Sequence, residues 1–200
     1  MCCRAGVPLP DAEVEFVPSG NILAGASDTG KSLLLHCLDY ILGSDRFRKR
    51  VPEIEPYASL FVEFGNSQGA TLTLKRDLSG GDLAVYDSPI AGISGAGRTI
   101  AARRYGKSLS DDVTSVLFPF AGIPEAKLRK NNQGEVQRLT IRTFFPLTLV
   151  DEISIIAERS PVLGDGGFDD TARKRMFSFM LTGKDDSGVI AAEKREIVQA

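Results

Sequence analysis

The chain has 200 residues, of which 42% are hydrophobic, and its formal net charge at pH 7 is −2. This length and apolar content are enough for one well-packed core with a smaller appendage. The nearly balanced charge gives the chain as a whole no basic footprint for nucleic acid. The sequence contains neither a run of about 18 apolar residues, which would predict a membrane span, nor the pattern of a signal peptide. We therefore expect a cytoplasmic protein with no membrane partner.

Side chains that usually bind transition metals are few. The cysteines, Cys2, Cys3 and Cys37, lack the spacing of a zinc site and suit a reducing cytosol. The single histidine, His36, falls inside a predicted helix, where we expect it to pack rather than to bind a metal. The composition therefore argues against a zinc centre.

Two apolar segments near the start of the chain are predicted to be strands. Residues 12–17 alternate apolar and polar side chains, which is typical of a half-buried strand. Residues 21–24 form a short apolar run, which predicts a buried strand. Only one strand fits ahead of this buried one, so the sequence looks cut at its start.

A glycine-rich loop follows the second of these segments. Residues 25–32 read Gly-Ala-Ser-Asp-Thr-Gly-Lys-Ser, which matches the phosphate-binding pattern G-x-x-x-x-G-K-[ST]. Residues 33–42 favour a helix that Gly43 would end. In this motif the loop N–H groups point at phosphate oxygens, at the positive end of the helix dipole. The predicted nucleotide-binding residues are Gly25, Ala26, Ser27, Asp28, Thr29, Gly30, Lys31, Ser32 and Leu33.

Two side chains of the loop have predicted chemical roles. Lys31 would reach the β- and γ-phosphates of ATP and act in catalysis, and the Ser32 hydroxyl would join the shell of a Mg²⁺ ion. ATP and Mg²⁺ are therefore the expected cofactors. The alternative is a glycine-rich turn that precedes a helix and needs no ligand.

Between residues 57 and 87 the hydrophobic period changes to two, which predicts antiparallel strands joined by short turns. The predicted strands are residues 59–64, 70–76 and 83–86. The second turn lies within Leu78-Ser-Gly-Gly-Asp82, which resembles the LSGGQ signature of ABC-type ATPases. That signature must begin a helix, whereas this stretch lies between two strands, so we interpret it as a hairpin turn.

The chain beyond the predicted sheet is expected to be mostly helical. Residues 88–108 are rich in Gly, Ala, Ser and Arg and are predicted to be an exposed, mobile excursion. Ser110 is predicted to cap a short helix over residues 111–118. A further helical segment is predicted for residues 141–150, bent at Pro146.

The last part of the chain also favours helix. Residues 169–181 are predicted to form a helix that Gly183 ends. Residues 190–200 are again rich in helix formers, but no glycine or proline ends the pattern. A helix that stops in mid-pattern predicts a fragment of a longer protein.

An acidic pair ends the apolar run Leu147-Thr-Leu-Val-Asp151-Glu152, which resembles a Walker B strand. On that interpretation Asp151 would hold Mg²⁺ and Glu152, as a catalytic residue, would polarise the attacking water. The run follows Pro146 directly and continues as an apolar stretch over residues 153–157, unlike a central strand that ends at its acidic residue. Another role near the nucleotide and a purely structural role therefore remain open.

Taken in order, these segments resemble the N-terminal half of an SMC-like, SbcC-type P-loop ATPase head. In that family the phosphate loop is followed by a helix ending in a Tyr-Ile-Leu-Gly-like stretch, here Asp39-Tyr-Ile-Leu-Gly43. The resemblance implies an α/β fold with a P-loop NTPase N-lobe over residues 1–183. It places a β-subdomain at about 58–87, a helical lobe at about 109–183 and the start of a coiled-coil exit helix at 184–200.

The resemblance also implies a function. Such a head binds ATP, forms an ATP-dependent homodimer and hydrolyses ATP only with its C-terminal half, which carries the family's signature, Walker B and switch histidine. DNA is implied as a partner by resemblance alone, in repair, maintenance or defence. Residues 140–161 take the place of the family's Gln loop but contain no glutamine, so Asp151 or Glu152 would have to substitute. We expect this chain alone to bind ATP weakly and to hydrolyse almost none.

Two other classes of protein stay open. A compact P-loop kinase, GTPase or other NTPase would use Asp151 and Glu152 as its own Walker B, although the guanine-reading N-K-x-D pattern is absent. A non-catalytic nucleotide-binding or scaffold module would instead use the β-subdomain to bind a protein partner. Nucleotide-dependent dimerisation distinguishes the ATPase head from the scaffold, and the nucleobase preference distinguishes it from a GTPase.

Overall fold

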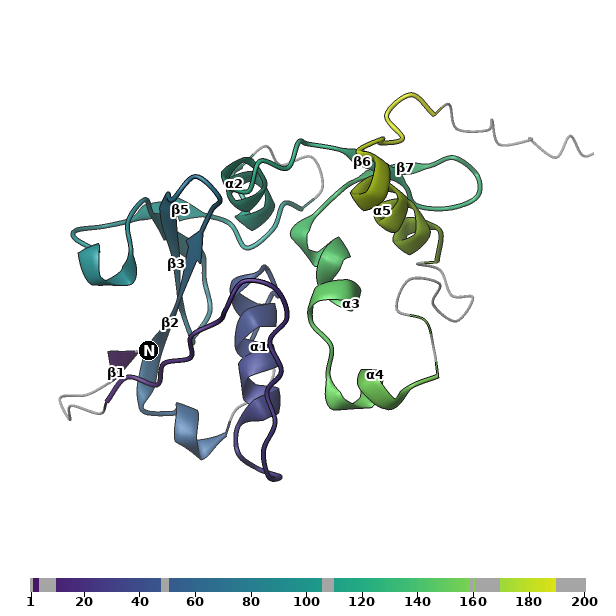
Figure 1. Ribbon diagram of the computed structural model, residues 1–200. Coiled ribbons are helices and arrows are strands. Elements are labelled where there is room, and N and C mark those ends of the chain that lie inside the picture. Colours follow the sequence, from purple (N-terminus) through teal and green to yellow (C-terminus); the bar gives the residue numbers. More distant parts are fainter. Residues whose placement is uncertain are drawn as a thin grey trace, which may run out of the picture. The chain divides into compact units, whose positions relative to one another are not determined.

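A computed structural model gives the fold of the protein (Figure 1). The chain divides into two compact units, Met1–Gly122 and Ile123–Ala200. Both units contain helices and antiparallel strands, so the protein belongs to the mixed α/β class. The residues that the structure describes are 2–3, 10–47, 51–105, 110–158, 160 and 170–189.

The first unit is built on a five-stranded antiparallel sheet with the order β1-β2-β3-β4-β5. Strands β2 to β5 pair in chain order, as in a meander. The three predicted strands and their antiparallel pairing are confirmed as β2, β3 and β4. The strands are β1 Cys2–Cys3, β2 Tyr57–Gly65, β3 Thr71–Asp77, β4 Leu83–Tyr86 and β5 Arg98–Ile100.

The segment after β4 is more ordered than predicted. Ile90–Gly92 form the 3₁₀ helix η2 and Arg98–Ile100 form β5, in which Ile100 is buried. Most of the described residues of this segment are exposed, as predicted, but the segment also contains regular structure, because the edge of β4 offers backbone partners that β5 takes up. Residues 106–109 of the predicted excursion lie outside the described part of the chain.

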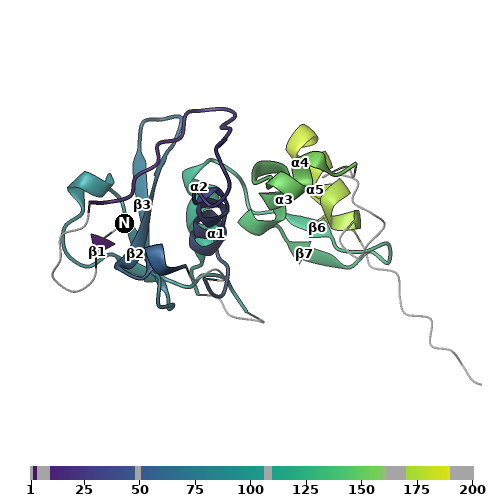
Figure 2. The ribbon, with the colours of Figure 1, turned by 90° about the horizontal axis from the view of Figure 1, so that it is seen from below.

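One face of the sheet carries the core of the first unit, and the helices α1 (Lys31–Ile41) and α2 (Val113–Phe120) lie on that side (Figure 2). The register places Leu74 between Val62 and Val85, and Leu74 is completely buried. α1 contacts β2 and β3 and contributes two completely buried side chains, Tyr40 and Ile41, to this core.

A buried guanidinium holds the C-terminal end of α1. Gly43 and Ser44 end the helix as a Schellman motif, with N–H groups donating to the carbonyls of Tyr40 and Asp39 at 3.3 and 3.0 Å. Arg76 of β3 donates from the same guanidinium nitrogen to the carbonyls of Tyr40 and Ser44, at 2.7 and 2.6 Å. Its Nε donates to the carbonyl of Gly81 at 3.1 Å, so one side chain joins α1 to the β3–β4 turn.

The Leu78–Asp82 stretch forms the turn between β3 and β4. Gly80 and Gly81 have φ angles of 113° and 97°, which glycine adopts without steric cost. The stretch connects two strands and begins no helix. The interpretation as a hairpin turn is therefore confirmed.

Helix α2 begins two residues later than predicted. Its N-cap is Asp112, whose carboxylate accepts from the N–H of Ser115 at 2.8 Å. The Ser115 hydroxyl in turn accepts from the N–H of Asp112 at 2.8 Å, which completes a capping box. Ser110 is therefore not the cap, because only Asp112 has this reciprocal partner three residues ahead.

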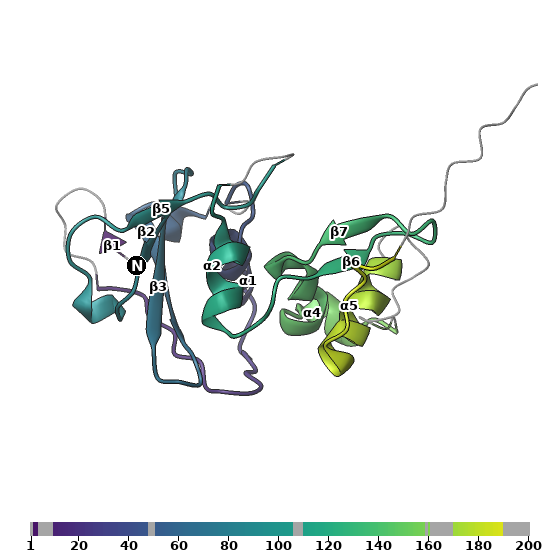
Figure 3. The same ribbon diagram turned by 90° about the horizontal axis from the view of Figure 1, so that it is seen from above.

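The second unit combines a β-hairpin with short helices. Helix α5 packs against β6 and η3 (Figure 3). The predicted helix over 169–181 is confirmed as α5, which Gly183 ends with φ of 66°. The elements are β6 Lys127–Arg129, β7 Val136–Arg138, η3 Ile141–Phe144, α3 Phe145–Thr148, α4 Glu152–Ile156 and α5 Asp170–Thr182.

Two sequence predictions for this unit need correction. Residues 141–150 form a 3₁₀ turn and one α-helical turn rather than a single bent helix, and Pro146 lies in the first turn of α3. The predicted exit helix at 184–200 does not begin at residue 184, because residues 184–189 are not helical. Residues 190–200 lie outside the described part of the chain.

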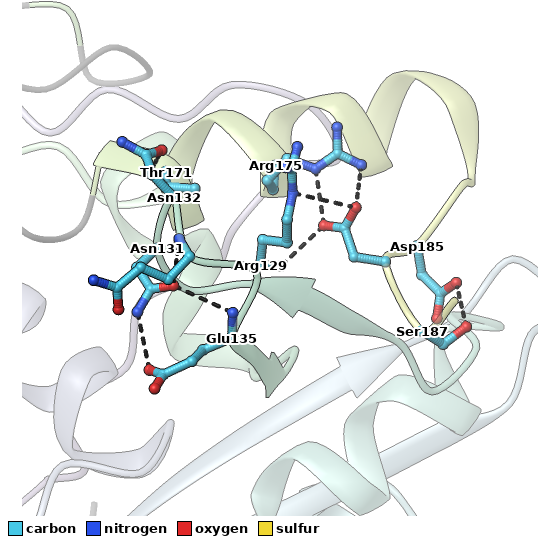
Figure 4. Close-up of polar contacts among 10 residues, drawn as sticks. Arg129, Asn131, Asn132, Glu135, Thr171, Arg175, Asp185 and Ser187 are labelled. Carbon is cyan, nitrogen blue, oxygen red and sulfur yellow. Dashed lines mark hydrogen bonds and ion pairs between the residues drawn. The ribbon is translucent and has the colours of Figure 1, made fainter. Parts of the chain in front are cut away.

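Figure 4 shows Arg129 and Arg175 side by side in the second unit. The carboxylate of Asp186 contacts both residues and ties the non-helical residues 184–189 to the rest of the unit. Its side chain is only 3% exposed and accepts from Arg175 at 2.8 and 2.5 Å. The backbone N–H of Arg129 also donates to it at 2.9 Å, and the Arg129 guanidinium lies 3.9 Å away. Burial alone would raise the pKa of Asp186, but these hydrogen bonds and the two guanidinium charges hold it below its ordinary value.

The anchoring role of Arg76 can be tested by its removal. We expect Arg76→Met to lower the free energy of unfolding by about 3 kcal/mol, because three backbone carbonyls lose their donor in a buried site. Arg98→Met is the matched control, since the ion pair of Arg98 with Asp111 is half exposed and should contribute less than about 1 kcal/mol. Urea unfolding followed by circular dichroism measures both variants. Equal effects would contradict the anchoring role.

The Asp186 cluster predicts acid sensitivity in the second unit. Because the folded pKa of Asp186 is below its ordinary value, its stabilisation is complete at neutral pH and is lost as the pH falls below about 4. We expect Asp186→Asn to lower the free energy of unfolding at pH 7 by about 3 kcal/mol and to flatten its acid dependence.

Urea unfolding between pH 3 and pH 7 measures this dependence, and the exposed residue Glu125 provides the control Glu125→Gln. An Asp186→Asn chain as acid-sensitive as the wild type would show that other groups carry the effect.

Candidate nucleotide-binding loop

The predicted phosphate loop leads directly into α1. Residues 25–30 form an irregular, exposed turn, and the 11-residue helix α1 begins at Lys31. Gly30 is the N-cap residue and has a left-handed backbone with φ of 85°. Among the described residues, no side chain caps this end of the helix. The loop therefore ends at a helix N-terminus whose donors face no competing side-chain acceptor.

Both glycines of the motif are required by the backbone. At Gly30 any side chain would be strained, because the left-handed region is costly for residues with a Cβ. At Gly25 a Cβ would lie 3.3 Å from Thr29 Oγ1, which is closer than usual for such a contact. The Thr29 hydroxyl is itself fixed, since it donates to the carbonyl of Ala26 at 2.8 Å. The Thr29 side chain, close to Gly25 and hydrogen-bonded to Ala26, thus holds the two ends of the turn close together.

The Lys31 side chain folds back over the loop. Its Nζ donates to the carbonyl of Gly25 at 2.8 Å and to the carbonyl of Ala26, and it lies 3.4 Å from Thr29 Oγ1. The structure therefore brings together Lys31 and three of the predicted loop residues. An anionic oxygen is a stronger acceptor for an ammonium group than a neutral carbonyl, so a phosphate would compete well for this lysine.

The donors at this end of α1 fit a phosphate group. The N–H groups of Lys31, Ser32 and Leu33 have no acceptor inside the helix because no turn precedes them. The helix dipole and the Lys31 charge both favour an anion at the same place. The described residues include no group of three or more His, Cys, Asp or Glu side chains suited to a metal. The Ser32 hydroxyl, which is predicted to join the shell of a Mg²⁺ ion, is exposed at the start of the helix.

The two strands predicted ahead of the loop are not formed. Residues 21–24 are irregular and their side chains are exposed, with Ile22 at 94%. Residues 12–17 are also irregular, and their apolar side chains Val14, Phe16 and Val17 are about half exposed. Both predictions are wrong for a common reason. The pattern favours strands, but a strand needs a neighbour to pair with, and within the described residues none lies beside these segments.

The two segments are nevertheless joined by a defined reversal of the chain. The Asn21 side chain accepts from the N–H of Val17 and donates to its carbonyl, both at 2.9 Å. Ser19 has a left-handed backbone with φ of 87°. One amide side chain thus satisfies both backbone groups of Val17 where a neighbouring strand would otherwise do so.

Helix α1 carries apolar side chains around most of its circumference, and its polar residues Ser32, His36 and Asp39 share one side. Only Cys37, Tyr40 and Ile41 are buried, and His36 is half-buried, as expected for a packing residue. Burial raises the pKa of the Cys37 thiol to about 11, so this thiol stays protonated at neutral pH. The remaining apolar side chains of the helix region are half-buried, namely Leu33, Leu34, Leu35, Leu38 and Leu42.

The acidic pair lies in the second unit and has a structural partner. Asp151 is the N-cap of α4, and its Oδ1 accepts from the N–H of Ser154 at 2.8 Å. Hydrogen bonds from the Ser154 side chain and backbone lower the pKa of Asp151. The residues before it are helical or irregular, so the predicted Walker B strand is absent. The contacts of Asp151 with Mg²⁺ and of Glu152 with water stay predictions.

Arg76, the residue that fixes the helix carrying the loop, was not predicted from the sequence. Its signal was present in the hydrophobic period, because Leu72, Leu74 and Arg76 are spaced by two and share the buried face of β3. A charged residue in a buried series predicts a specific partner. The partners here are backbone carbonyls, which no sequence motif records.

Comparison with known proteins gives no family for this chain: no family model, curated protein or solved structure matches it. Within the described residues, no helix is both long and apolar enough to cross a membrane. The candidate site is thus defined by the loop and helix of this chain alone.

Proposed function

We propose that the chain is an ATP-binding module in which residues 25–32 hold the phosphates. The observation that carries the proposal is the position of the loop at the uncapped N-terminus of α1, with the Lys31 ammonium folded over it. Backbone donors, the helix dipole and a cation are therefore offered at one place. The phosphates of a nucleotide would satisfy all three.

We further propose that this site is the N-terminal half of an SMC-like ATPase head. Two observations support the idea that a further protein segment packs beside the loop in the complete head. Residues 12–17 and 21–24 have strand patterns but expose their apolar side chains. Helix α1 carries leucines that the first unit leaves only half-buried, namely Leu33, Leu34, Leu35 and Leu38, whereas the apolar face of a helix is normally packed against another element. Strands of a C-terminal half would cover both.

Hydrolysis in this proposal belongs to the complete head. Binding energy from the loop holds the nucleotide, but hydrolysis also needs a positioned water and charge stabilisation opposite the γ-phosphate. The C-terminal half would supply these groups, and ATP would join two such heads in a dimer. DNA belongs to the proposal through the family resemblance only.

Nucleotide binding is tested by removing the loop lysine. We expect Lys31→Ala to weaken binding of a fluorescent ATP analogue in the presence of Mg²⁺ by about 10- to 100-fold, because a charge-assisted contact with the phosphates is lost. Lys75→Ala removes a lysine of the sheet surface in the same unit and should leave the affinity unchanged. Fluorescence titration measures all three chains. Equal affinities for Lys31→Ala and wild type would rule out the loop as the site.

The half-head proposal predicts that the purified chain binds ATP without turning it over. We expect phosphate release at the level of the buffer blank, with and without Mg²⁺, because in this proposal the C-terminal half supplies the groups that act on the γ-phosphate. A phosphate-release assay on wild type, Lys31→Ala and Glu152→Gln measures this. Mg²⁺-dependent turnover that both substitutions abolish would instead favour a compact NTPase that uses Asp151 and Glu152.

A further inference from the structure

The second unit exposes an acidic apolar segment, residues 150–158. Every residue of this segment is exposed, and Ile153, Ile155 and Ile156 of α4 are 75%, 71% and 78% exposed. Residues 150–158 contain three acidic side chains, those of Asp151, Glu152 and Glu158, and Arg159 follows directly in the sequence, so residues 150–159 have a formal net charge of −2. Three isoleucines open to water on one short stretch are unusual for a surface without a partner.

The same unit exposes a basic apolar face on α5. Phe177, Met180 and Leu181 are spaced by three and four, so they share one side of the helix. They are 38%, 51% and 71% exposed, whereas Met176 and Phe179 on the other side are buried. Arg173 and Lys174 stand four and three residues before Phe177 and continue this side toward the start of the helix. We call these five residues the α5 face. Asp170 also lies on this side and pairs with Lys174, so the three charged side chains together carry a formal charge of +1.

We propose that residues 150–158 of one copy of the chain bind the α5 face of a second copy, and that the second copy returns the same contact. The segment offers isoleucines flanked by carboxylates, and the α5 face offers apolar side chains beside two cations. Apolar burial would supply the affinity, and the opposite charges would align the two surfaces. Two identical contacts related by a two-fold axis make a closed dimer.

A second copy is the occupant that the structure favours. The acidic apolar segment and the α5 face belong to the same compact unit, yet both remain exposed there, so they do not cover each other within one chain. Lys174 pairs with Asp170 at 3.9 Å, and its side chain remains 53% exposed. The segment and the face are therefore complementary to each other and both accessible.

The dimer is independent of the proposed nucleotide site, because none of its contacts involves residues 25–32. We expect it to form with or without ATP, with a dissociation constant on the order of 10 µM, since each contact is small. Its affinity should fall as NaCl is raised from 50 to 500 mM, because exposed charge pairs are screened by salt.

Sedimentation velocity of the full chain at about 5 to 200 µM tests the proposal, with each variant checked for folding by circular dichroism. We expect a monomer–dimer equilibrium for the wild type. The dissociation constant should rise at least about tenfold for Ile153→Ser/Ile155→Ser and for Met180→Ser/Leu181→Ser, since buried apolar area is lost. Ile90→Ser removes an exposed isoleucine of the first unit and should leave the equilibrium unchanged.

Mixing the two double variants distinguishes this interface from non-specific association of exposed apolar side chains. One variant keeps its α5 face and the other keeps its acidic apolar segment, so the mixture can form one of the two reciprocal contacts and should regain part of the dimer. Three outcomes would overturn the proposal. The wild type could be monomeric at 200 µM, both double variants could retain the dimer, or the mixture could be no more dimeric than its components. A dimer that forms only with ATP would also overturn it and would point to the phosphate loop instead.

Discussion

The Arg76 guanidinium is the interaction on which the candidate site depends. It is buried among the carbonyls of Tyr40, Ser44 and Gly81 and lies 3.9 Å from the centre of the Tyr40 ring. A cation is favourable at this place because the carbonyls of a helix C-terminus carry partial negative charge. α1 is thereby fixed at the end that is farthest from the loop. The opposite end, about 16 Å away along the helix axis, carries the phosphate-binding residues.

Each unit contains a buried charged side chain, and the two charges are stabilised by different kinds of group. In the first unit a buried cation is surrounded by neutral carbonyls, and burial lowers the pKa of Arg76. In the second unit a buried carboxylate, Asp186, is matched by the guanidinium groups of Arg175 and Arg129. In each unit a buried charged side chain thus links segments that are far apart in the sequence.

Sequence periodicity predicted those elements that find their partners within the chain. β2, β3 and β4 were predicted because their alternating pattern is matched by neighbouring strands, and α5 because Gly183 ends it. Residues 12–17 and 21–24 have equally clear patterns but no partner strand among the described residues, so they remain irregular. A hydrophobic pattern records that a segment is to be buried, and it does not record which surface buries it.

The start of α2 was predicted wrongly because several neighbouring residues are suitable as its N-cap. Ser110, Asp111 and Asp112 are all good N-cap residues, and only the reciprocal bond with Ser115 selects Asp112. For the candidate site, the loop, its glycines and Lys31 were all predicted from one motif, because the motif encodes backbone conformation directly. The anchoring by Arg76 was not, since a backbone carbonyl is available at every residue and leaves no mark in the sequence.

The buried thiol of Cys37 gives the protein an internal reporter. It lies in the middle of α1, is 5% exposed and has a pKa of about 11, so thiol-specific reagents should modify it only when the helix separates from the sheet. The rate of its modification would then follow the opening of the element that carries the phosphate loop. A ligand that binds at the loop and stabilises this helix would therefore slow the modification of the thiol without contacting it.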